Sequence, residues 1–334
     1  MKKNILTWDL GATKAAAALV AYCPESQHFN CLKQTALKLS ETQSLRDLIE
    51  QLETRLAFNM HEADAICIGA AGHFDGRELS HTNPYPFAMP FAQLAADLKW
   101  PAFNVIHDYA PVVCATFTPY MQQEGNVKWL NQPDGSLSAR GRRVALGIGT
   151  GLGLKDGVLF PNGDFWLGQN EAGHMGITMP PTSDHIRLSR HQALLHFLHL
   201  QHQPMTFEAI LSGQGLARLQ QFFYPEANLT TPEEAGVALT AGKSPEVAAA
   251  FAWYAGLFVG SVQLNFMPES GVWITGGVAR THLSLFDHPE FAAGINASPA
   301  YLAQRATYPL GVLCNEQHAF IGGAYYAVKR LLGS

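Results

Sequence analysis

Residues 143–160 read RVALGIGTGLGLKDGVLF, in which a glycine-rich segment separates two apolar runs. Apolar runs joined by such a turn are typical of a β-hairpin. Residues 5–22, ILTWDLGATKAAAALVAY, repeat the same order near the start of the chain. The repeat predicts two structurally related halves that face each other across a cleft, each contributing one hairpin turn.

The turn of the later hairpin is predicted to bind phosphate. Glycine occupies positions 147, 149, 151 and 153, so one face around Thr150 is bare backbone. Bare backbone presents N–H groups, which bind phosphate oxygens. The segment is neither a G-x-G-x-x-G motif nor a Walker loop, because residue 152 is leucine and no glycine-lysine-serine or -threonine follows. Glycines at a close packing point are the alternative interpretation.

The composition indicates a soluble globular protein long enough for two domains, since 47% of its 334 residues are apolar and 15% are charged. The net charge is −5 and no basic stripe is present, which argues against a nucleic-acid partner. No stretch approaches the ~20 apolar residues of a membrane helix, so we expect a cytoplasmic chain without membrane association. The five cysteines form no C-x-x-C pair and are expected to be reduced core residues.

Periodicity predicts strands and helices on either side of a polar surface loop at 124–142. Ser44 is a candidate cap for a helix over 44–58, and a closing helix is expected after Gly323. The predicted strands are 4–9, 15–23, 29–37, 65–72, 103–110 and 271–277, and the predicted long helices are 187–202, 231–241 and 245–265.

Asp108 lies near the carboxyl end of the predicted strand 103–110, at the edge of the sheet where open α/β folds bind ligands. The same aspartate is also a candidate N-cap for the segment that follows it. Both interpretations stand at this point.

A second polar group is predicted around Gly173. Glu171 and His174 lie three residues apart, and Glu208 precedes a further glycine break. Carboxylates and a histidine beside exposed backbone suit a polyhydroxylated ligand, since each hydroxyl both donates and accepts. For Glu208 alone, a solvated helix residue is the simpler interpretation.

Other candidates carry weaker signals. Asn83 precedes a proline and either lines the cleft or forms an Asx turn. Gly276 and Gly277 follow a buried strand and either approach a nucleoside or phosphate or pack closely at a helix start. Histidines recur at helical spacing, but no cysteine or carboxylate pair joins them, so a half-exposed helix is favoured over a metal site. They are His191, His196, His199 and His202.

Taken in order, the motifs resemble the bacterial glucokinase family from residue 4 to the final helix. The resemblance implies an α/β, two-domain actin-like ATPase (ribonuclease H-like) fold, with mixed sheets flanked by helices and a cleft between the domains. It implies a small domain of residues 1–113 with 315–334 and a large domain of 114–314. The motifs are Asp9-Leu-Gly-Ala-Thr-Lys14, His107-Asp108-Tyr109, Gly149-Thr150-Gly151-Leu152-Gly153, Glu171-Ala-Gly-His174, Glu208 with Leu211-Ser-Gly213, and Thr275-Gly-Gly277.

The resemblance implies ATP-dependent phosphorylation of glucose at its 6-hydroxyl, the first step of glycolysis, with Asp108 as the general base. Asp9 would hold Mg²⁺ through water, and Gly276 and Gly277 would lie against the nucleoside of ATP. The residues implied to bind the sugar are Asn83, His107, Asp108, Glu171, His174 and Glu208. The residues implied to bind the ATP phosphates are Gly11, Ala12, Thr13, Lys14, Gly149, Thr150, Gly151 and Gly153.

Three departures qualify the resemblance. His107 stands where the family has asparagine, which leaves another hexose or an amino sugar as an alternative substrate. Ala12 and Lys14 replace the usual glycine and asparagine, and Lys14 is typical of the related ROK kinases and repressors. Residues 177–192 lack the cysteine-rich motif of those relatives, so no zinc is expected.

A non-catalytic sugar-binding regulator is a weaker alternative, because only three residues precede Asn4 and Asp108 is retained. A homodimer is compatible with the resemblance. The sequence does not distinguish ATP from ADP or polyphosphate as the phosphate donor. It does not reveal how the protein is regulated.

Overall fold

The computed structural model describes residues 2–11, 13–80, 85–132, 141–177, 180 and 182–333. The chain folds into two compact units. Unit 1 comprises residues 1–126 and 315–334, and unit 2 comprises residues 127–314. Each unit has a hydrophobic core of its own.

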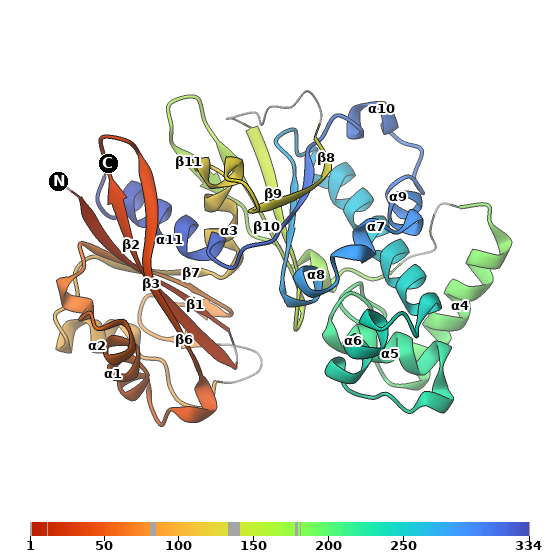
Figure 1. Cartoon of the computed structure of the whole chain (residues 1–334), viewed down its shortest axis with the longest axis horizontal. Helices are drawn as coiled ribbons and strands as arrows, with labels where there is room; N and C mark the ends of the chain where they lie inside the picture. Colours follow the sequence, from red (N-terminus) through yellow and green to blue (C-terminus); the bar gives the residue numbers. More distant parts are fainter. Residues whose placement is uncertain are drawn as a thin grey trace. The chain divides into compact units, whose positions relative to one another are not determined.

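Unit 1 is built on a five-stranded mixed sheet (Figure 1). Its strands are β1 (Lys3–Leu10), β2 (Lys14–Cys23), β3 (His28–Lys38), β4 (Ala65–Ala70) and β7 (Phe103–His107), in the order β3-β2-β1-β4-β7. β1 runs antiparallel to β2 and parallel to β4, and β4 runs parallel to β7. The first predicted hairpin is therefore confirmed. Two short strands, β5 (His73–Phe74) and β6 (Leu79–Ser80), pair separately.

Helices cover both faces of this sheet (Figure 1). α1 (Leu45–Leu56) begins as predicted, because Ser44 Oγ accepts a hydrogen bond of 3.1 Å from the Asp47 N–H. α1 and α2 (Phe91–Asp97) share a core with β1 side chains such as Trp8. α3 (Tyr109–Ala115) and α11 (His318–Arg330) pack together on the opposite face.

The prediction that the closing helix starts after Gly323 is wrong. α11 begins at His318, so Gly322 and Gly323 lie inside the helix. A Cβ on Gly322 would lie 1.6 Å from the Pro111 carbonyl oxygen of α3. The glycines therefore allow α11 to approach α3 closely, an outcome of tertiary packing that overrides their low helix propensity.

Unit 2 contains a six-stranded sheet whose topology repeats that of unit 1. Its strands are β8 (Val127–Asn131), β9 (Gly141–Ile148), β10 (Leu152–Leu159), β11 (Phe165–Leu167), β12 (Val272–Thr275) and β13 (Leu310–Leu313), in the order β11-β10-β9-β12-β13-β8. From β11 to β13, the pairings are antiparallel, antiparallel, parallel and parallel, as they are from β3 to β7. The predicted relation between the halves is confirmed in strand order and direction.

β8 corrects the prediction of a surface loop over 124–142. Val127–Asn131 forms an edge strand that pairs antiparallel with β13, and residues 133–140 lie outside the described part of the chain. The segment has no apolar alternation of its own. Its pairing depends on a strand almost 200 residues away, which local periodicity does not report.

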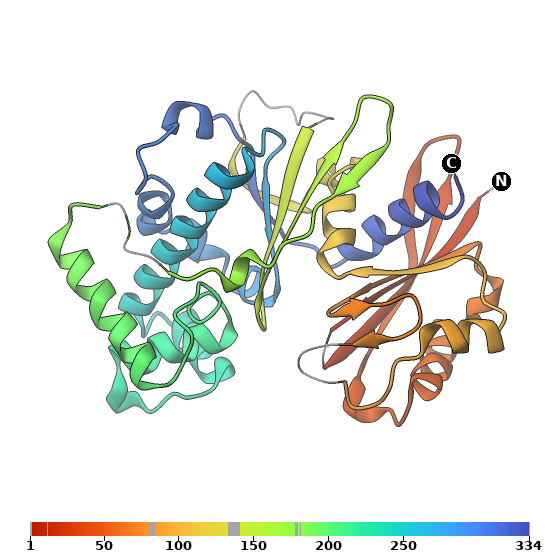
Figure 2. The ribbon, with the colours of Figure 1, turned by 180° about the vertical axis from the view of Figure 1, so that it is seen from behind.

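The helices of unit 2 gather around α7 (Pro245–Phe266), whose buried side chains form much of the core, as Figure 2 shows from behind. The others are α4 (His185–Leu200), α5 (Gly213–Phe223), α6 (Pro232–Thr240), α8 (Gly277–Thr281), α9 (Pro289–Ile295) and α10 (Leu302–Arg305). Of the helices in the described ranges, α7 is long and apolar enough to cross a membrane. This differs from the expectation that no stretch has the length and composition of a membrane helix. The most apolar window of α7 is 72% buried, as in a core helix.

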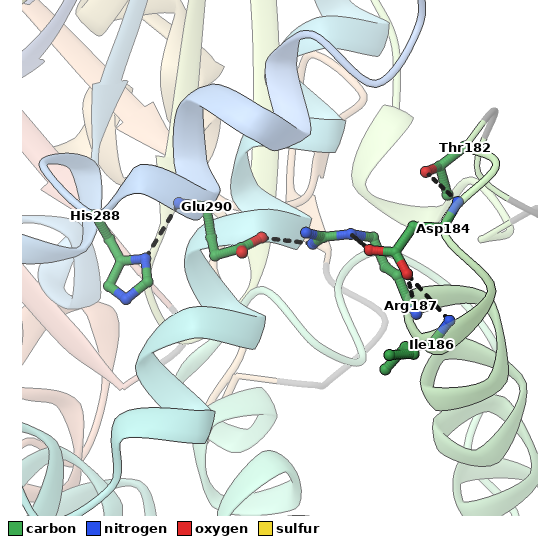
Figure 3. A network of polar contacts seen from close by, with 6 residues as sticks. All are labelled: Thr182, Asp184, Ile186, Arg187, His288 and Glu290. Carbon is green, nitrogen blue, oxygen red and sulfur yellow. Dashed lines mark hydrogen bonds and ion pairs between the residues drawn. The ribbon is translucent and has the colours of Figure 1, made fainter.

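An ionic network joins α4 to α9 (Figure 3). Arg187 donates to Glu290 at 2.5 Å and lies 3.6 Å from Asp184, the N-cap of α4. The hydrogen bond to Glu290 raises the pKa of the Arg187 guanidinium, and the Arg187 N–H lowers the pKa of Asp184. The guanidinium also stacks 4.9 Å from the Trp253 ring centroid of α7. One arginine thus connects three helices.

The helical interpretation holds for His191, His196 and His199, which lie in α4, a helix that is exposed along one side. His202 lies beyond the end of α4 and has φ +53°. His191 is buried, with Nδ1 at 2.7 Å from the Tyr254 hydroxyl. The cysteines only partly match the expectation of core residues. All five are free; Cys67 and Cys114 are buried, and burial raises their thiol pKa, but Cys23, Cys31 and Cys314 are only half-buried.

Residues 114–126 lie in unit 1, whereas the sequence boundary placed them in the larger domain. The Tyr120 hydroxyl donates to the Asn315 carbonyl oxygen at 3.2 Å. Asn126 Nδ2 donates to the Tyr120 carbonyl oxygen at 3.0 Å, and Asn315 Nδ2 donates to Asn126 Oδ1 at 3.3 Å. These bonds hold the segment against the returning C-terminal part of the chain.

Candidate functional site

The glycine turn between β9 and β10 has the form that the sequence predicts. Ile148 pairs with Leu152, so Gly149, Thr150 and Gly151 form the loop. The Gly149 N–H donates to the Gly151 carbonyl oxygen at 2.9 Å. The Gly213 N–H donates to the Gly149 carbonyl oxygen at 2.8 Å, which fastens the loop to the start of α5. The loop presents backbone rather than bulky side chains.

The second glycine segment of unit 2 lies directly beside this turn. β12 runs parallel to β9 and places Thr275 opposite Gly147. Gly276 has φ +99°, and a Cβ there would lie 2.3 Å from the Ile148 carbonyl oxygen, so only glycine fits. A Cβ on Gly149 would lie 3.5 Å from the Gly277 nitrogen. The two glycine segments therefore form one continuous surface of bare backbone.

Glu208 links this turn to the predicted polar cluster. Its Oε2 accepts a hydrogen bond of 3.0 Å from the Leu152 N–H, and its Oε1 lies 3.7 Å from His174 Nδ1. A Cβ on Gly151 would lie 2.7 Å from the same Oε2, so the Glu208 carboxylate can occupy this position only because residue 151 is glycine. Glu208 lies in a turn before α5 and does not behave as a solvated helix residue.

Glu171 is the N-cap and His174 the last residue of a short 3₁₀ helix, Ala172–His174, next to β10. A Cβ on Gly173 would lie 1.9 Å from the Leu152 carbonyl oxygen, and the Gly173 carbonyl oxygen accepts from the Glu208 N–H at 3.0 Å. Both Glu171 and His174 are exposed. The predicted cluster and the glycine turn thus come together within unit 2.

Two residues that sequence reasoning missed, Arg218 and Tyr85, belong to the surroundings of the predicted carboxylates. Burial lowers the pKa of the Arg218 guanidinium, and the charge of Glu208 opposes that shift. Burial, followed by the charge of Asp108, raises the pKa of the Tyr85 hydroxyl, which donates to the Ala71 carbonyl oxygen at 2.6 Å. Neither residue lies in a glycine motif, so only the folded chain brings it to its carboxylate.

In unit 1, Asp108 lies just beyond the carboxyl end of β7. Its N–H donates to the Ala70 carbonyl oxygen at 3.1 Å, at the end of β4. Its Oδ1 accepts from the Tyr109 N–H at 3.0 Å and lies 2.9 Å from His107 Nδ1. Asp108 is therefore the N-cap of α3, yet its side chain stays 27% exposed and accessible to a ligand. The N-cap interpretation is confirmed, and the role of this aspartate at a ligand site stays a prediction.

Asp9 lies on the same edge of the sheet as Asp108. β1, β4 and β7 are parallel, with Asp9 opposite Gly69 and Ala70 opposite His107. In the adjoining β1–β2 turn, the Gly11 N–H donates to the Lys14 carbonyl oxygen at 2.9 Å, and Thr13 is exposed. The predicted residues Ala12 and Asn83 lie outside the described residues.

The donor set suits ATP with Mg²⁺ better than a metal held by protein alone. Within the described ranges, no group of three or more His, Cys, Asp and Glu side chains is placed to hold an ion. Mg²⁺ keeps several waters and is usually bound by one or two carboxylates together with substrate phosphates. Asp9, an exposed carboxylate at the end of β1, fits that requirement.

The fold is similar to solved structures of sugar kinases. A glucokinase from an Antarctic psychrotroph superposes with a TM-score of 0.78 at 18% identity, covering 97% of this chain and 98% of that chain. A glucokinase from Balamuthia mandrillaris in complex with glucose gives 0.76 at 18% identity, covering 98% and 94%. A ROK hexokinase from Thermus thermophilus gives 0.61 at 19% identity, covering both chains fully. The chain therefore shares the α/β fold of these solved structures, with mixed sheets flanked by helices, as predicted.

Within that class, the chain belongs to the glucokinase family, whose model matches residues 6–330. A curated glucokinase from Saccharophagus degradans is 25% identical over 95% of each chain. One from Brucella abortus is 27% identical, covering 98% of this chain and 91% of the relative. The resemblance inferred from the motifs is confirmed.

Proposed function

We propose that the chain is an ATP-dependent hexose kinase that phosphorylates glucose at its 6-hydroxyl to give glucose 6-phosphate. The observation that carries the proposal is the position of Glu208. This carboxylate accepts from the glycine turn at Leu152 N and faces His174. A surface suited to phosphate and a cluster suited to sugar hydroxyls therefore share one residue. Membership of the glucokinase family supports the same activity.

In the proposed reaction, Asp108 accepts the proton of the sugar 6-hydroxyl as its oxygen attacks the γ-phosphorus of ATP. A new O–P bond forms, the bond to the β–γ bridging oxygen breaks, and ADP leaves with the electron pair. Such a transfer asks the protein mainly for positioning and charge stabilisation. Part of this positioning and charge stabilisation would come from backbone N–H groups. These lie around Gly149–Gly153 and in the first turn, at Gly11, Thr13 and Lys14. Gly276 and Gly277 would lie against the nucleoside.

Mg²⁺, held through water by Asp9, would neutralise charge on the β- and γ-phosphates. Glu171, His174 and Glu208 would hold the other sugar hydroxyls, with Asn83 and His107 as neighbours. Asp108 belongs to unit 1 and Glu208 to unit 2. We further propose cytoplasmic location and a small-molecule substrate pair, with a homodimer compatible with both.

A coupled ADP-release assay over a panel of hexoses and amino sugars tests the proposal. We expect the highest kcat/KM with glucose and ATP. Activity confined to an amino sugar or another hexose would favour the alternative that His107 raises. Sugar binding without ADP release from ATP would favour a sensor over a kinase.

The Asp108→Ala variant tests the base. We expect kcat to fall by about 10² to 10⁴, since general-base catalysis contributes that much, while sugar binding falls modestly. Asp97→Ala is the matched control. The Asp97 carboxylate, at the end of α2, is 50% exposed and lies 3.8 Å from an Arg46 guanidinium nitrogen. If turnover of Asp108→Ala stays within about tenfold of the parent, the base assignment is wrong.

A further inference from the structure

Asp156, in β10, is a buried charged residue that the proposed reaction does not use. Its side chain is 3% exposed, and its two carboxylate oxygens have different partners. Oδ2 lies 3.8 Å from Arg142 Nη1 of β9, and Oδ1 accepts a hydrogen bond of 3.4 Å from Asn170 Nδ2. Burial raises the pKa of the Asp156 carboxyl, and the charge of Arg142 opposes that shift. Because a carboxylate is costly to bury, its partners indicate what it holds in place.

The backbone of residues 168–172 lies directly against this carboxylate. The Gly168 N–H donates to the Asp156 carbonyl oxygen at 2.9 Å, and a Cβ on Gly168 would lie 1.9 Å from Asp156 Oδ1. Asn170 continues the segment, and its side-chain oxygen accepts from the Ala172 N–H at 3.3 Å. Asp156 therefore meets the segment at its start and, through Asn170, at its end.

The side-chain amide of Asn170 makes both contacts in one orientation only. A carboxylate accepts hydrogen bonds, so the NH₂ group must face Asp156, and a backbone N–H donates, so the amide oxygen must face Ala172. The bond from Ala172 to Asn170 spans two residues and closes an Asx turn around Glu171. The backbone conformation of Glu171 is therefore linked to Asp156.

We infer that Asp156 is a positioning residue for the sugar site: through Asn170 it fixes the turn that places Glu171 and His174 against the sugar hydroxyls. This inference rests on the proposed function. His174 ends the 3₁₀ helix that the turn begins, so a shift of the turn moves both side chains. With 3% of its side chain exposed, Asp156 acts on the sugar through Asn170 rather than by direct contact.

The expected effect is on sugar affinity. Glu171 and His174 are proposed to hold hydroxyls other than the one that reacts, so they bind the sugar equally before and during phosphoryl transfer. Loss of such binding raises KM and leaves kcat unchanged. We expect Asp156→Ala to raise the KM for glucose about three- to tenfold, the range for one hydrogen bond, with kcat within about twofold of the parent. Asp156→Asn retains an acceptor oxygen and should recover most of the affinity.

Asn170→Ala tests the same contact without a change in the core, because Asn170 is only half-buried. We expect a similar rise in KM, and no further rise when it is combined with Asp156→Ala, since both changes break one series of contacts. Asn162→Ala is the matched control. Asn162 Oδ1 also accepts from a backbone N–H two residues on, at 3.1 Å, but it lies in the exposed turn between β10 and β11.

Three kinetic outcomes overturn the inference: an unchanged KM in Asn170→Ala, additive rises in the double variant, or an equal rise in Asn162→Ala. Thermal unfolding of each variant identifies losses that arise from misfolding. If Asp156→Ala does not fold, the comparison of Asn170→Ala with Asn162→Ala decides the question.

A measurement that needs no activity separates this inference from the proposed function. Hydrogen exchange followed by mass spectrometry reports how firmly the amides of residues 168–174 are held. We expect faster exchange there in Asp156→Ala and Asn170→Ala than in the parent, and an unchanged rate in Asn162→Ala. Unchanged exchange in the first two variants overturns the inference even if the chain is a kinase. Faster exchange in both, without ADP release by the parent on any sugar, overturns the proposed function and leaves the contacts of Asp156 intact.

Discussion

At the scale of single residues, buried histidine is the clearest determinant of pH-dependent stability. His282 is 7% exposed, with Nδ1 at 3.4 Å from the Thr240 hydroxyl of α6. Burial lowers the pKa of its imidazole below the usual value near 6.5. The unfolded chain therefore binds a proton more readily than the folded chain. The stability from neutral His282 is complete above pH ~6.5 and is lost as the pH falls through the lower folded pKa.

We expect the free energy of unfolding to decrease between pH 7.5 and pH 5, and His282→Phe to reduce that decrease. Urea unfolding at both pH values measures the effect. His61→Gln is the control, because His61 is exposed. An identical pH dependence in the parent and in His282→Phe would show that other groups cause it.

The site residues that sequence reasoning finds are those that stand in glycine motifs or at strand ends. Asp108 and Glu208 are such residues, and the structure places each in a defined polar contact. Tyr85 and Arg218 are not, because their approach to the carboxylates depends on how a loop and a helix pack.

At the scale of elements, the contact between Gly173 and β10 joins the polar cluster to the glycine turn. A Cβ at Gly173 would lie 1.9 Å from the Leu152 carbonyl oxygen, so Gly173→Ala must separate the two segments. We expect a loss of about 3 kcal/mol in the free energy of unfolding, at the upper end of overpacking costs. Urea unfolding gives the value.

Gly277→Ala is the matched substitution, because among the described residues no atom beyond its chain neighbours and its own helix backbone lies within 4 Å of the added Cβ. We expect its stability to stay within about 0.5 kcal/mol of the parent and its KM for ATP to rise, since the methyl group would occupy space next to the nucleotide. An unchanged KM for ATP would argue against the nucleotide position. Equal stability of the two variants would contradict the packing argument.

Elements with strong local patterns are predictable, and those fixed by distant contacts are not. The β1–β2 hairpin and α1 follow from apolar periodicity, a turn and the Ser44 cap. β8 forms in a polar stretch because β13 offers an unpaired edge. α11 contains two glycines because close approach to α3 requires them. For β8 and for α11, the element that determines the structure, β13 or α3, is remote in sequence.

At the scale of the whole molecule, the repeat of residues 5–22 in 143–160 correctly predicts two units with the same strand order. The extent of each unit is harder to predict, because it depends on where the chain crosses from one core to the other. Hydropathy also misleads at this scale. α7 has the length and composition of a membrane span, but it is largely buried within the core of unit 2.

The hydrogen bond between Asn126 and Asn315 has a consequence for how the gene product can be divided. Unit 2 is an insertion whose entry and exit points adjoin, since these side chains meet at 3.3 Å. A short glycine linker from 126 to 315 should therefore close unit 1 around its own core without unit 2. We expect the spliced protein to show a cooperative unfolding transition by circular dichroism. The absence of a transition would mean that unit 1 needs unit 2 in order to fold.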